Sequence, residues 1–109
     1  MLTQDQIDFY NENGYLAVEN VLTVNELDAL RQVTDDYVER SRAVTESDDI
    51  FDLEPGHSAE SPKLRRIKGP AAQHELYADT MRHEGALDIL AQLIGPNIRA
   101  IGHKLNMKS

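Results

Sequence analysis

The stretch TVNELDALRQVTDDYVERSRAV, residues 23–44, has the clearest periodic pattern in the sequence. Apolar side chains recur every three or four positions, at Leu27, Leu30, Val33 and Tyr37. Thr23 and Glu26 have the spacing of a capping box, in which each side chain satisfies a free amide at a helix start. We therefore predict a long helix that begins after Thr23, ends near Val44 and buries one face.

The segment before this helix predicts a second, shorter one. Thr3 and Gln6 repeat the capping-box spacing, and Asn13 with Gly14 forms a pair that can adopt the left-handed conformation that ends a helix. The run of apolar residues 15–18 is typical of a short strand.

The segment after the long helix changes character. Residues 46–60 are rich in acids and contain a Pro-Gly pair, so we expect a mobile loop without a packed element. Residues 63–67 predict a strand in which Leu64 and Arg66 share one face, while Arg65 and Ile67 share the other.

Helical spacing returns around residues 76–81 and 87–94, and Gly95 with Pro96 ends the second of these helices. Residues 98–108 then alternate as a strand, with Leu105 on one face and Lys104 and Asn106 on the other. Because the sequence stops within this strand, we expect an unpaired sheet edge and interpret the chain as a fragment.

The composition limits the classes of function. The chain has 109 residues, which suits one domain, and a formal charge of −8, which repels nucleic acids and anionic membranes. It has no cysteine, so any metal site would need histidines and carboxylates. No long apolar run or signal segment is present, so we expect no membrane partner and a cytoplasmic location.

The residues themselves suggest little metal chemistry. None of the four histidines has an acidic residue two positions later, so surface or packing roles are the favoured interpretation. The lysines and arginines suggest a candidate binding site. Arg65 and Arg66 on one strand, with Lys104, Lys108 and Asn106 on one face of another, would suit a small dianion. Cations on an edge strand more often discourage aggregation, and composition alone favours that interpretation.

Six segments, taken in order, resemble the phytanoyl-CoA dioxygenase family: residues 2–7, 13–22, 26–31, 63–67, 93–98 and 103–108. The resemblance implies an α+β fold in which outer helices pack on the first strands of a double-stranded β-helix, or jelly roll. It also implies an Fe(II)- and 2-oxoglutarate-dependent dioxygenase that hydroxylates a small organic molecule with release of succinate and CO2.

The same resemblance places Arg66, Lys104 and Asn106 near the 2-oxoglutarate pocket. The family's iron ligands come after the last segment, so we expect residues 1–109 to be the N-terminal part of one dioxygenase domain. We expect no catalytic residue and no metal ligand in this chain, and no activity from it alone. The alternative is a non-catalytic interaction module that offers its sheet edge to a partner, such as a second copy or a missing C-terminal part.

Overall fold

The computed structural model describes residues 1–108 and has an α+β fold, as predicted. The elements follow in the order α1 (Gln4–Asn13), α2 (Val24–Ser41), β1 (Phe51–Leu53), β2 (Leu64–Lys68), α3 (Pro70–Gln73), α4 (Glu75–Met81), α5 (Glu84–Ile94) and β3 (Lys104–Asn106).

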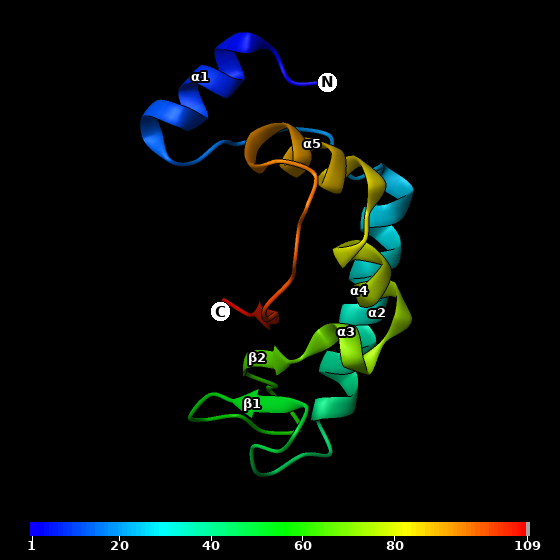
Figure 1. Ribbon diagram of the computed structural model, residues 1–109. Coiled ribbons are helices and arrows are strands. Elements are labelled where there is room, and N and C mark those ends of the chain that lie inside the picture. The colour runs from blue at the N-terminus through cyan, green and yellow to red at the C-terminus, as the bar shows by residue number, and fades with distance from the viewer. Residues whose placement is uncertain (109) are drawn as a thin grey trace.

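The chain is bent into an open crescent (Figure 1). Helices α1 and α5 form one end, the sheet forms the other, and α2 with α4 forms the back that joins them. The radius of gyration is 16.8 Å, whereas a compact domain of this length has about 13 Å. The molecule therefore has an open inner side rather than a closed globular surface.

Both predicted capping boxes are present. Thr3 accepts from the amide of Gln6, and Thr23 accepts from the amide of Glu26, while each partner side chain accepts the amide of its threonine. Helix α1 ends at Gly14, whose φ of 80° is left-handed. Helix α2 ends at Ser41, before the predicted end at Val44, because the amides of residues 42–44 bond to the carbonyls three residues earlier instead of four.

The predicted strand at residues 15–18 is wrong. This segment has no strand partner among the described residues, since the sheet forms at the opposite end of the crescent. It runs instead as irregular chain from α1 past α5 to α2 (Figure 1).

The acidic segment 46–60 is not only a loop, because it contributes strand β1. The sheet is antiparallel with the order β1-β2-β3, and Phe51 of β1 lies opposite Ile67 of β2. Phe51 is only 3% exposed. The prediction failed because three strand residues among acids show no periodicity, whereas burial of Phe51 against a distant strand supplies the missing stabilisation.

The predicted faces of β2 are also wrong. Leu64 and Ile67 both lie in the core, because the register shifts between Asp52 and Leu53 and leaves Arg65 as an extra residue, a β-bulge. Strict alternation would place the Arg65 charge in the core beside Ile67. The bulge keeps Arg65 outside, where its Nε lies 3.1 Å from Glu54 Oε1.

The last strand is shorter than predicted. Only Lys104–Asn106 forms β3, and Ile101 is 96% exposed. Strand β2 ends at Lys68 and α3 begins two residues later, so residues 98–103 meet no strand of the described chain with which to pair. The predicted faces of β3 itself are confirmed, since Leu105 packs against the core.

The core lies between the sheet, α2 and α4. Its buried members are Tyr37, Phe51, Leu64, Ile67 and Tyr77. The Tyr37 hydroxyl donates to the main-chain oxygen of Gln73, and the Tyr77 hydroxyl lies 2.6 Å from that of Thr34. Within residues 1–108, no helix combines the length and apolar character needed to cross a membrane.

Candidate functional site

The three predicted site residues lie on one face of the sheet. The register places Arg66 opposite Asn106 and Lys68 opposite Lys104. Ile67 and Leu105, which alternate with them, contact the core beside α2, so these four polar side chains belong to the face that points away from α2. Asp52 of β1, opposite Arg66, completes what we call the polar face.

Strand pairing brings these side chains close together. The Met107 amide donates to the Arg65 oxygen, so Leu105 and Met107 direct their main-chain groups toward β2. Arg66 and Asn106 therefore form a non-hydrogen-bonded pair, the type in which opposite Cα atoms approach to about 4.5 Å. The main-chain groups of Lys104 and Asn106 point away from β2.

Arg66 forms an ion pair within this face. Its Nε lies 2.8 Å from Asp52 Oδ2, with side-chain exposures of 36% and 19%. The Nε–H is not aligned with the carboxylate, so this buried nitrogen has no hydrogen-bond partner within residues 1–108. Asp52 thus balances the charge of Arg66 without accepting a hydrogen bond from its Nε.

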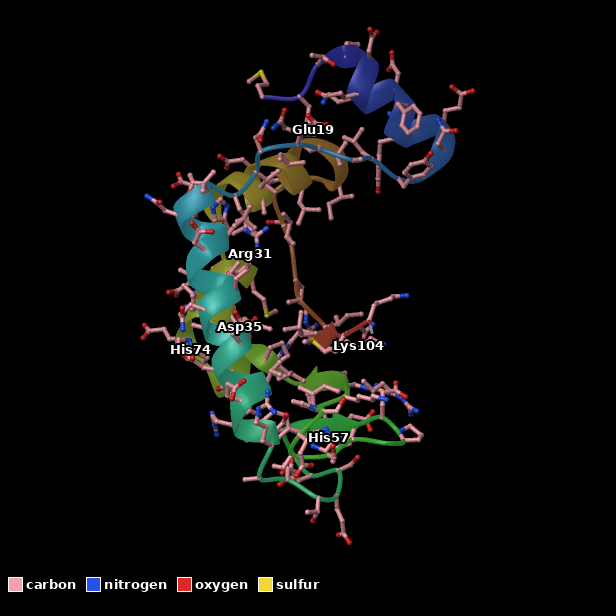
Figure 2. The ribbon with its side chains drawn as sticks, turned by 180° about the vertical axis from the view of Figure 1, so that it is seen from behind. Glu19, Arg31, Asp35, His57, His74 and Lys104 are labelled. Carbon is pink, nitrogen blue, oxygen red and sulfur yellow. The ribbon has the colours of Figure 1, made fainter. Side chains whose placement is uncertain are left out.

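The remaining polar groups differ in how firmly they are held. Lys68 Nζ donates to the main-chain oxygen of Asp48 at 2.8 Å. Lys104 and Asn106 are exposed, and no side-chain hydrogen bond of either is found within residues 1–108. Figure 2 shows Lys104 on the inner side of the crescent, away from α2.

The polar face carries groups of the kinds that bind small dianions in proteins. Arg66, Lys68 and Lys104 provide three positive charges, Asp52 offsets one, and the Asn106 amide can donate to a carboxylate oxygen. Sequence reasoning found Arg66, Lys104 and Asn106 but missed Lys68 and Asp52. The alternation from Arg66 to Lys68 was a usable signal, whereas Asp52 had none without β1.

The acidic segment supports this face by structural contacts. The Asp48 carboxylate accepts the amides of Phe51 and Ile50, which holds the pKa of Asp48 below its usual value. Glu54 hydrogen-bonds Arg65 and raises the pKa of that guanidinium. These hydrogen bonds help to hold β1 against β2, so the segment is not a free loop.

The four histidines have hydrogen bonds that hold local structure. His57 bridges the Ser41 oxygen and the Lys63 amide, and His103 accepts from the Ala71 amide. His74 and His83 accept amides at the starts of α4 and α5.

Across residues 1–108, no three side chains of the metal-binding types gather closely enough to hold a metal ion. The described residues therefore do not fit an iron centre.

The match to a known family agrees with the resemblance seen in the sequence. The family model for phytanoyl-CoA dioxygenase (PhyH) matches residues 10–108, which is nearly the whole chain. No curated protein and no solved structure gives a significant match. The extent of the family match shows that the chain belongs to the phytanoyl-CoA dioxygenase family.

Proposed function

We propose that this chain is the N-terminal part of an Fe(II)- and 2-oxoglutarate-dependent dioxygenase. In the complete domain, the reaction would combine a small organic substrate, O2 and 2-oxoglutarate to give the hydroxylated product, succinate and CO2. Family membership supports the reaction class. The observation that carries the proposal is the polar face itself, which gathers Arg66, Lys104 and Asn106 on the side of the sheet opposite the helices.

In this proposal the three-stranded sheet is the beginning of a jelly roll and the polar face lines its interior. Arg66 and Lys104 would bind the carboxylates of 2-oxoglutarate, and the Asn106 amide would donate to one of their oxygens. The iron ligands would come from a part of the domain outside these 109 residues, because no three metal-binding side chains gather within residues 1–108. The role of the chain is then to position the cosubstrate.

The first test is the extent of the native protein. Intact mass and C-terminal sequencing of the protein from its source should show a chain that continues and contains further histidines and carboxylates. That protein should form succinate from 2-oxoglutarate in the presence of Fe(II) and oxygen, whereas the 109-residue chain should not. A native protein that ends at Ser109 and forms no succinate would refute the proposal.

The second test addresses the polar face in the complete protein. Lys104→Met removes one charge from the proposed pocket, and loss of a charge-assisted hydrogen bond typically costs about 1.5 to 3 kcal/mol. We expect the KM for 2-oxoglutarate to rise about tenfold or more. Lys63→Met is the matched control, because Lys63 is exposed and lies just outside β2. Equal effects of both variants would remove Lys104 from the site.

One observation favours a second candidate, the interaction module. The outer edge of β3 has no strand partner within residues 1–108. In that case the native 109-residue protein would pair this edge with a second copy or another protein.

Hydrogen exchange distinguishes the two candidates. The Met107 amide is already bonded to β2, so the amides that report on a partner are those of Lys104 and Asn106. Slow exchange of both in the isolated chain, together with a doubled mass in solution, would support the module. Fast exchange of both in a monomeric chain would count against it.

A further inference from the structure

An apolar hollow is formed by α1 and residues 15–17. This end of the crescent lies far from the sheet that carries the polar face (Figure 1). The volume of the hollow is about 360 Å3, and Asp5, Gln6, Phe9, Tyr15, Leu16 and Ala17 line it. Phe9 and Tyr15 pack edge to face with ring centroids 5.2 Å apart, yet they remain 41% and 63% exposed. Two aromatic rings are thus held in place without being covered.

The hollow is not part of the core. Helix α1 has no buried residue, and its end of the chain is tied to α5 through the bond from the Leu2 amide to Gln92 Oε1. Helix α1 protrudes from the rest of the molecule (Figure 1). An approaching molecule could therefore reach the hollow without meeting the sheet.

The segments that form the hollow carry acidic side chains and no lysine or arginine. Residues 1–30 contain six of the 19 acidic residues and none of the 11 lysines and arginines. Asp5 lines the hollow, and Asp8 and Glu12 follow on the exposed surface of the same helix. This charge disfavours nucleic acids and anionic membranes, and it favours a partner that carries cations around an apolar anchor.

We propose that this hollow, formed by α1 and residues 15–17, docks a basic amphipathic segment of another protein. An apolar side chain of the segment would contact Phe9 and Tyr15, and its lysines or arginines would lie over the acidic residues of α1. The proposal uses no residue of the polar face, so its test does not depend on whether the polar face binds 2-oxoglutarate.

The test uses the 109-residue chain and a fluorescein-labelled synthetic helix of about 16 residues, with leucines on one face and lysines elsewhere. We expect saturable binding by fluorescence anisotropy that weakens as the ionic strength rises from about 0.01 M to about 0.15 M. A peptide of the same composition, with its leucines scattered around the helix, should bind about tenfold more weakly.

Three variants separate the contributions. Phe9→Ser with Tyr15→Ser should weaken binding about tenfold. The triple variant Asp5→Asn, Asp8→Asn, Glu12→Gln should weaken peptide binding severalfold and flatten its dependence on salt. The control is the triple variant Glu46→Gln, Asp49→Asn, Glu60→Gln, which removes the same charge from exposed residues at the opposite end of the crescent. Its affinity for the peptide should stay within about twofold of that of the unmodified chain.

A measurement on the unmodified chain guards against misfolded variants. Amide NMR signals of residues 15–17 should shift when the peptide is added, and those of β2 should not. The proposal is overturned if the control variant binds as poorly as the α1 variant, or if the scattered peptide binds equally well. It is also overturned if the chain dimerises in solution through Phe9, because the hollow then holds a second copy.

Discussion

Replacement of Ile67 by alanine tests the placement of the core directly. Ile67 is fully buried in the central strand, between Phe51 on one side and Leu105 on the other. The substitution removes three carbon atoms from a site enclosed by the sheet and by α2, so the surrounding side chains have little freedom to close the cavity.

The expected cost follows from this burial. Isoleucine-to-alanine changes in well-packed cores cost about 2 to 5 kcal/mol, and the full burial of Ile67 favours about 3 to 4 kcal/mol. Domains of this length have a free energy of unfolding of about 5 to 16 kcal/mol. With a urea m value of about 1 to 1.5 kcal/mol/M, the midpoint should fall by about 2 to 4 M.

Urea unfolding followed by circular dichroism measures this shift, and Ile94→Ala is the matched control. It makes the same chemical change at a side chain that is 57% exposed at the end of α5. We expect it to cost less than about 1 kcal/mol, because little apolar surface returns to water. A difference of under about 1 kcal/mol between the two variants would refute the placement of the core at the sheet.

Three further predictions concern hydrogen bonds that hold the elements together. Folding lowers the pKa of Asp48, so this carboxylate stabilises the fold above its ordinary pKa of 3.8. The stabilisation is lost as pH falls through the lower folded value. Asp48→Asn should therefore flatten the decline of the urea midpoint below about pH 4. His83→Ala removes both the cap of α5 and the 2.7 Å contact with Glu26, and we expect urea unfolding to show a loss of about 1 kcal/mol that His83→Asn largely restores. Burial is the main reason that the pKa of Tyr77 lies above 10.0. The free energy of unfolding should fall as pH rises above about 10, since the unfolded chain loses this proton first. In urea unfolding, Tyr77→Phe should remove that decline, and near neutral pH it should cost about 1 kcal/mol because the bond to Thr34 is lost.

Sequence reasoning succeeded where the interactions are local. The capping boxes at Thr3 and Thr23 and the glycine ends at Gly14 and Gly95 all appear at the predicted positions. A capping interaction joins residues within one helical turn, so the residues that stabilise the helix end are the same ones that reveal it in the sequence.

The candidate site was only partly accessible from the sequence. Arg66, Lys104 and Asn106 were predicted from alternation and family resemblance, and the register brings them onto one face. Their proposed role in binding 2-oxoglutarate stays a prediction. Asp52 could not be found, because its place beside Arg66 depends on a strand that the local sequence does not reveal.

The sequence by itself determined the starts of α1 and α2, the ends of α1 and α5, and the alternation that separates Leu105 from Lys104 and Asn106. Only the tertiary structure decided that Phe51 starts a strand, that Arg65 forms a bulge and that β3 is limited to three residues. The physical reason is that a strand is stabilised by partners distant in sequence, and charge burial decides which residues may face the core. A capping interaction joins residues within one helical turn, whereas strand pairing joins residues that are far apart in the chain.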